Sequence, residues 1–154
     1  EKTMREGGLV PSTTVIALLK KELSRSPGSL IALDGFPRNL ENYEDFDALC
    51  GTPEFVLYID VPDEVMMERI LERGAASGRV DDNLDSGAKR LRTFREVTLP
   101  TLRHMEASGV PVYVVDGRRT PEEVWEHCLE VCDPIKVTFS MNEGDERLRT
   151  ITII

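Results

Sequence analysis

Cysteine is scarce in this chain, with three cysteines among 154 residues. Cys50, Cys128 and Cys132 lack the spacing of a metal site, and their odd number leaves at least one thiol outside any disulfide. This usage is typical of a reduced, intracellular protein. Cys128 and Cys132 lie one helical turn apart, and we expect them to be core or half-buried residues rather than a redox pair.

Long apolar runs are also absent. No segment approaches the about 20 apolar residues that a transmembrane helix needs. The first residues, Glu-Lys-Thr-Met-Arg, do not have the shape of a signal peptide. The sequence therefore predicts a cytoplasmic protein with no membrane partner.

Positive charge is in deficit, because 19 basic residues face 28 acidic ones and the formal net charge is -9. This balance disfavours non-specific binding to nucleic acid or to an acidic membrane. Within the acidic chain, a basic cluster suits a small polyanion such as a nucleotide, although it could also be a solvated helix face. The cluster consists of Arg73, Arg79, Lys89, Arg90, Arg92 and Arg95.

Three short apolar runs indicate the fold. Residues 30–33 and 55–59 show no alternation of polar and apolar side chains, which favours strands buried on the faces of a parallel sheet, and residues 110–115 indicate a third strand. Helical patterns separate these runs, and the length suits one domain. We therefore expect an α/β protein with three parallel strands flanked by helices.

Two helix boundaries carry specific signals. Thr120-Pro121-Glu122-Glu123 has the pattern of a capping box with proline at the first helical position. A long helical stripe from residue 83 to residue 107 contains Pro100, which is expected to kink or break it.

The first apolar run ends at Asp34, where a parallel sheet binds its ligands. At this edge Asp34 could hold Mg²⁺ through water. Gly35 permits a tight turn, and Arg38 offers a planar, permanently charged fork to a phosphate. The alternative is an ordinary turn followed by a solvated surface arginine.

The string Asp-Gly-Phe-Pro-Arg-Asn at residues 34–39, followed by Asn42, resembles the signature of nucleoside monophosphate kinases, the family of adenylate and uridylate–cytidylate kinases. The resemblance runs from about Glu6 to Asp133. It implies a P-loop NTPase-like, three-layer parallel sheet and phosphoryl transfer from ATP, with Mg²⁺, to UMP or CMP, or to AMP. In the uridylate–cytidylate branch Asn39 and Asn42 face the pyrimidine, which puts these acceptors modestly ahead of AMP.

A second stretch, Ser-Gly-Arg-Val-Asp-Asp-Asn at residues 77–83, resembles the short lid of these kinases. Charge spreads over the oxygens of the transferred phosphoryl group, so mobile arginines suit this chemistry. The resemblance assigns Arg73 and Arg79 to the donor and transferring phosphates. It places Arg90 beside Arg38 on the acceptor side. Asp81 and Asp82 would orient the arginines; without the resemblance, this stretch would be an ordinary flexible loop.

The resemblance also implies two contacts to the nucleotide bases. Leu9 and Val10, in a Gly-Leu-Val-Pro turn, would lie against the acceptor base, chiefly through backbone atoms. The loop from Gly117 to Arg119 would lie along the donor adenine, again through backbone groups.

The motif Gly-x-x-x-x-Gly-Lys-Ser/Thr, whose loop cradles donor phosphates, does not occur in the 154 residues. In the family it follows a central strand between those predicted at 30–33 and 55–59. An empty slot would leave buried backbone groups unpaired at about 1–3 kcal/mol each. We therefore expect the slot to be filled, with other domains or chains supplying strand and loop. A preceding segment is favoured as occupant, and Thr150–Ile154 is the alternative, as in a permuted domain.

These considerations divide the chain into a kinase-like domain at residues 1–133 and an extension at 134–154. The extension is expected to form a β-hairpin, with strands at 137–141 and 148–154, or a linker to another module. Two functions remain. The chain is part of a kinase that is active only with the phosphate loop, or it is a catalytically dead structural or nucleotide-sensing module of a larger assembly, such as a cilium or flagellum.

Overall fold

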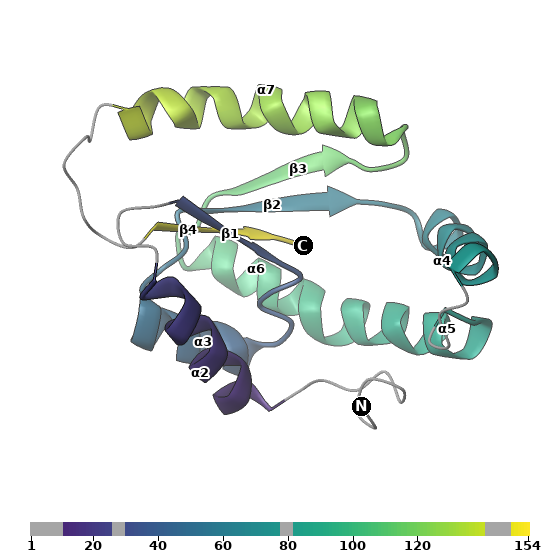
Figure 1. Ribbon diagram of the computed structural model, residues 1–154, viewed down its shortest axis with the longest axis horizontal. Helices are drawn as coiled ribbons and strands as arrows, with labels where there is room; N and C mark the ends of the chain where they lie inside the picture. The colour runs from purple at the N-terminus through teal and green to yellow at the C-terminus, as the bar shows by residue number, and fades with distance from the viewer. Residues whose placement is uncertain (1–10, 26–29, 78–81, 141–148) are drawn as a thin grey trace.

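The computed structural model describes residues 11–25, 30–77, 82–140 and 149–154. Its centre is one parallel sheet with the strand order β1-β4-β2-β3 (Figure 1). The strands are β1 (Leu30–Asp34), β2 (Phe55–Asp60), β3 (Val112–Asp116) and β4 (Arg149–Ile153). The three predicted strands and their parallel arrangement are confirmed.

The slot between β1 and β2 exists, and β4 fills it. Leu30 to Asp34 of β1 lie opposite Arg149 to Ile153, and Phe55 to Leu57 of β2 lie opposite Ile151 to Ile153. The favoured occupant, a preceding segment, is therefore wrong in this structure, and the alternative is right. The β-branched residues 150–153 suit a buried strand, and pairing on both sides satisfies the two facing edges.

The expected β-hairpin in the extension is also wrong. Residues 137–140 are the last turn of a helix, α7 (Pro121–Ser140), and β4 pairs with β1 and β2 instead of with a neighbouring strand of the extension. Helical hydrogen bonding continues from the preceding turns of α7 into these residues, and this tertiary and local context outweighs their β-propensity. The predicted turn at 142–145 lies outside the described residues.

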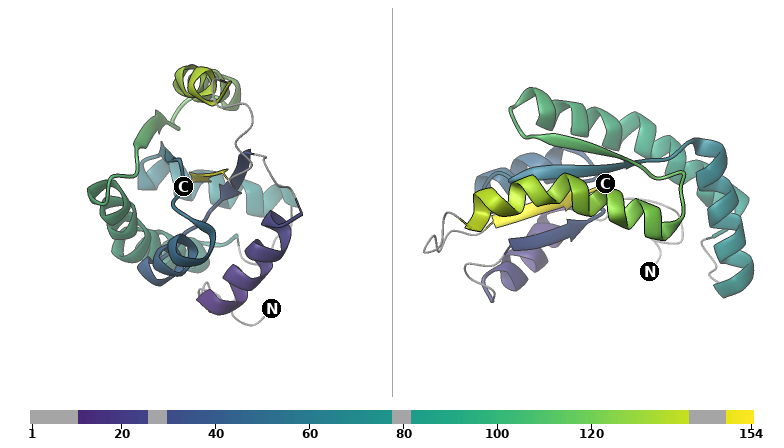
Figure 2. Two further views of the ribbon diagram at one scale, coloured as in Figure 1. Left: turned by 90° about the vertical axis from the view of Figure 1, so that its left-hand side faces the viewer. Right: turned by 90° about the horizontal axis from the view of Figure 1, so that it is seen from above.

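The helices form layers on both faces of the sheet (Figure 2). On one face, α7 covers a cluster of Phe55, Leu57 and Val115, with Cys128 and Cys132 packed against it. The opposite face packs against the remaining core clusters, which contain residues of α2, α3 and α6. The other helices are α2 (Ser12–Leu23), α3 (Leu40–Cys50), α4 (Asp63–Ser77), α5 (Leu84–Thr93), the π-helical turn η1 (Phe94–Thr98) and α6 (Leu99–Ala107).

The cysteines agree with the expectation from the sequence. All three are free and half-buried, and burial raises the pKa of the Cys50 and Cys128 thiols. Across the described ranges, no helix combines the length and the apolar character required to cross a membrane.

The helix boundaries bear out the capping prediction and refine the proline prediction. Thr120 accepts from the Glu123 N–H, and the Glu123 carboxylate accepts from the Thr120 N–H, so the capping box of α7 forms. Pro100 does not break its helix. Instead, α5, η1 and α6 follow one another without a gap, and the Leu99 N–H donates to the Phe94 carbonyl in a wider turn.

Candidate functional site

A cavity of about 230 Å³ lies at the carboxyl edge of the sheet. Strand β1 leads into it at Gly35, and the residue after β4, Ile154, lines it from the sheet side. The helical run α5–η1 forms the opposite wall. The lining residues are Gly35, Pro37, Arg38, Arg90, Thr93, Phe94, Thr98 and Ile154. The two arginines make this cavity suitable for an anion.

The turn after β1 holds Arg38 in the cavity wall. Gly35 has φ = +64°, a backbone conformation that favours glycine, and a Cβ at this position would lie 3.2 Å from Arg38 Nη2. Arg38 Nε donates to the Gly35 carbonyl at 2.8 Å. Among the residues that the structure describes, neither Nη atom of Arg38 has an acceptor, which leaves two guanidinium nitrogens to donate to a ligand.

A buried carboxylate joins two further predicted arginines, Arg73 and Arg90. The Asp82 side chain is fully buried and accepts from Arg73 Nε at 2.5 Å, from Arg73 Nη2 at 2.9 Å and from Arg90 Nη1 at 3.1 Å. Gly74 makes this arrangement possible, because a Cβ there would collide with the Asp82 carbonyl. Asp82 thereby ties the end of α4 to α5 and orients Arg90, which also lines the cavity.

The side chains of Asn39 and Asn42 accept hydrogen bonds from backbone N–H groups, which the sequence did not reveal. Asn39 caps α3 by accepting from the Asn42 N–H at 2.8 Å, and Asn42 Oδ1 accepts from the Arg38 N–H at 3.4 Å. Neither asparagine is among the described residues that line the cavity. The Asn42 side chain is buried, however, and its Nδ2 has no hydrogen-bond partner in the described part of the chain, so this amide group is available as a donor.

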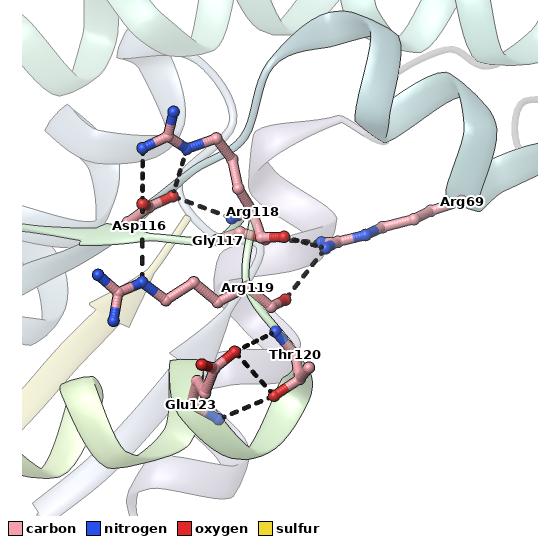
Figure 3. Close-up of polar contacts among 7 residues, drawn as sticks. All are labelled: Arg69, Asp116, Gly117, Arg118, Arg119, Thr120 and Glu123. Carbon is pink, nitrogen blue, oxygen red and sulfur yellow. Dashed lines mark hydrogen bonds and ion pairs between the residues drawn. The ribbon is translucent and has the colours of Figure 1, made fainter.

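The loop after β3 is held from outside by a residue that the sequence analysis missed (Figure 3). Arg69, on α4, donates from Nη1 to the Gly117 carbonyl at 2.7 Å. Its Nη2 donates to the carbonyls of Arg118 and Arg119 at 3.3 and 3.2 Å. The sequence carries no signal for these contacts, because all three acceptors are backbone carbonyls far from Arg69 along the chain.

The same loop is also tied to the end of β3. Arg118 makes bidentate contacts with Asp116 at 2.8 and 2.9 Å, which hold the pKa of that carboxyl well below its usual range (Figure 3). Gly117 is buried and cannot be enlarged, since a Cβ would clash with methyl groups of Ile59 and Val61. Together with the contacts from Arg69, these contacts fix the backbone of residues 117–119.

Asp34 ends β1 with an exposed side chain, immediately before Gly35 of the cavity. Within the described ranges, no three His, Cys, Asp or Glu side chains gather closely enough to hold a metal ion. A single exposed carboxylate fits Mg²⁺ bound through its water shell and does not fit a protein-only cage.

Several predicted residues lie outside the described ranges: Leu9, Val10, Arg79 and Asp81. In their place, the structure adds three cavity residues that the sequence did not suggest. Thr93, Phe94 and Thr98 come from the end of α5 and from η1. Phe94 stacks on Tyr58, whose hydroxyl donates to Asp60; burial and this hydrogen bond raise the pKa of Tyr58 to about 12.

An all-parallel sheet, helices on both faces and arginines in a cavity at the carboxyl edge define a P-loop NTPase-like nucleoside monophosphate kinase fold. The comparison with known families agrees, since the family model described as adenylate kinase matches residues 1–110. The chain belongs to the adenylate kinase family of nucleoside monophosphate kinases.

Named relatives support this assignment. The chain is similar to a UMP-CMP kinase of Prunus armeniaca (35% identical over 134 residues, 86% of this chain and 57% of the relative). It is also similar to a uridylate kinase of Saccharomyces cerevisiae (36% over 114 residues, 72% and 56%) and to adenylate kinase isoenzyme 1 of Homo sapiens (36% over 137 residues, 86% and 69%). The chain thus spans little more than half the length of the first two relatives.

Proposed function

We propose that this chain forms the acceptor-binding and lid part of a nucleoside monophosphate kinase that transfers a phosphoryl group from ATP to UMP, CMP or AMP. Activity requires a phosphate loop, a motif that the 154 residues do not contain. The observation that carries the proposal is the cavity lined by both Arg38 and Arg90, in which both Nη atoms of Arg38 can donate to an anion.

Each arginine has a distinct role in this proposal. Arg38 binds the acceptor phosphate with its fork, and Arg90 faces the same phosphate from α5. Arg73 and Arg79 neutralise charge on the donor and transferring phosphates, while Asp81 and Asp82 hold these arginines in register. The ion pairs that join Asp82 to Arg73 and Arg90 support this division.

The remaining groups recognise the bases and the metal. Leu9, Val10, Asn39 and Asn42 contact the acceptor base, and the unused Nδ2 of buried Asn42 is a donor suited to a pyrimidine oxygen. The backbone of Gly117 and Arg119 contacts the donor adenine, and Asp34 holds Mg²⁺ through water. Mg²⁺ supplies charge neutralisation at the transferring phosphates.

The alternative is a catalytically dead module with a structural or nucleotide-sensing role. It is favoured by the occupation of the central slot by β4. The names of the relatives, all of them kinases, favour an enzyme. Three free thiols suit the cytoplasm as the place of action.

The acceptor site is tested by measuring the affinity of the chain for UMP, CMP and AMP in NMR titrations. We expect each monophosphate to bind, and Arg38→Met to weaken binding by roughly tenfold to a hundredfold, because charge-assisted hydrogen bonds contribute about 1.5–3 kcal/mol. Arg92→Met is the matched control, since Arg92 is an exposed arginine of α5 that is not among the described residues lining the cavity. No binding by the unmodified chain, or equal losses in both variants, would contradict the proposal.

Turnover separates the two functions. In a polypeptide that joins this chain to a phosphate loop, ATP and a monophosphate should yield two diphosphates. Monophosphate binding without any turnover there would favour the nucleotide-sensing module. A clear preference for AMP over UMP and CMP would overturn the predicted choice of acceptor.

A further inference from the structure

One turn of the long helix between Leu84 and Ala107 has π geometry, and this turn borders the cavity. Pro100 has no N–H and its ring crowds the carbonyl of residue 96, so the ordinary i to i+4 pattern fails there. The Leu99 N–H instead reaches the Phe94 carbonyl. Single π turns in α-helices occur frequently at functional sites.

The π turn ends at Thr98, which makes a contact that spans 60 positions of the sequence. The Thr98 hydroxyl donates to the Arg38 carbonyl at 2.8 Å, and the residue is buried. On the other side of Arg38, the backbone N–H reaches Asn42 Oδ1 only at 3.4 Å. The bond from Thr98 is therefore the shorter of the two that hold the Arg38 backbone from outside its own turn.

We propose that Thr98 is a positioning residue of the anion cavity: its hydroxyl fixes the Arg38 backbone and thereby aims the guanidinium at the phosphate of a bound nucleoside monophosphate. This inference deepens the proposed function and rests on it. Thr98 acts through Arg38, because its single hydroxyl hydrogen is committed to the Arg38 carbonyl and is not available as a donor to the ligand.

The substitution that tests this role is Thr98→Val, which keeps the branched shape and removes the donor. Thr98→Ala is a second variant without the hydroxyl, for use if valine does not fit, and Thr98→Ser keeps the donor. Thr101→Val is the matched control. Thr101 is a buried threonine three residues further on, and its hydroxyl donates to the Val97 carbonyl at 2.8 Å within the helix, not to the site loop.

The measurement is the Kd for UMP and AMP by NMR titration of the full chain, with folding checked by thermal denaturation. We expect Thr98→Val to weaken binding roughly fivefold, the value of one ordinary hydrogen bond. Thr98→Ser and Thr101→Val should remain within about twofold of the unmodified chain. Equal affinity in Thr98→Val and the unmodified chain would overturn the inference.

A double-mutant cycle distinguishes positioning from a general structural role. If Thr98 acts through Arg38, adding Thr98→Val to Arg38→Met should change the Kd by less than about twofold. Additive losses would overturn the inference while leaving the proposed function in place. Failure of the unmodified chain to bind any of the three monophosphates would instead overturn the proposed function, and this inference with it.

Discussion

Thr152, in the middle strand β4, gives a direct test of how the central slot is filled. Its side chain is fully buried, and Oγ1 has no hydrogen-bond partner among the described residues. An unpaired buried hydroxyl costs about 1–3 kcal/mol, whereas an added buried methyl group contributes about 0.8 kcal/mol. Thr152→Val removes the first and adds the second at nearly constant shape. We therefore expect the free energy of unfolding to rise by about 2–4 kcal/mol.

Urea denaturation at constant m-value measures this change, and thermal denaturation should show a gain of roughly 2–4 °C per kcal/mol for a chain of this size. The matched control is Thr101→Val, in which an equally buried hydroxyl has a partner, the Val97 carbonyl. This control should show no gain. An unchanged or lower stability of Thr152→Val would show that the hydroxyl has a hydrogen-bond partner, such as water, and would refute this reasoning.

Arg69→Met should release the loop after β3, because three hydrogen bonds to its carbonyls are lost; amide exchange at residues 117–119 should accelerate by at least about tenfold. Arg103→Met, at an exposed position of α6, should leave that exchange unchanged, and equal rates in both variants would contradict the role of Arg69. The pKa of Asp116 is lowered by Arg118, below the unfolded value of about 3.9. This pair therefore stabilises the fold above about pH 4, and its contribution is lost as the pH falls further through the folded pKa. Urea midpoints should show less acid destabilisation in Asp116→Asn than in the unmodified chain, and identical acid losses would refute this assignment.

The strands were predictable because their signal is local. The apolar runs that became β1, β2 and β3 are short and end in turn residues, so each indicates a strand by itself, although Tyr113 and Val114 of the outer strand β3 are exposed. The signal that identifies the occupant of the central slot is not local. The sequence of β4 shows that it is a strand, but its place depends on which other segment can pair with both β1 and β2.

The candidate site divides in the same way. Arg38 was found because it belongs to a contiguous motif, and Arg90 was found because the family resemblance places it beside Arg38. Arg69 and Thr98 were missed because their partners, the Gly117 and Arg38 carbonyls, lie 48 and 60 positions away. A hydrogen bond from a side chain to a backbone carbonyl leaves no trace in the partner's residue type, since every residue carries that carbonyl. Only the fold reveals such contacts.

The π turn explains how Arg90 and Thr98, which belong to one continuous helical run, can both line the cavity. Arg90 and Thr98 both line the cavity, and they are eight residues apart. At 3.6 residues per turn, eight residues of regular α-helix would leave them about 80° apart around the helix axis. A π turn closes its hydrogen bond one residue later and rotates less per residue, which reduces this angle. Pro100, which the sequence suggested as a helix breaker, thus favours the wider turn. This turn brings Arg90, which is bound to Asp82, and Thr98, which is bound to the Arg38 carbonyl, towards the same face of the helix.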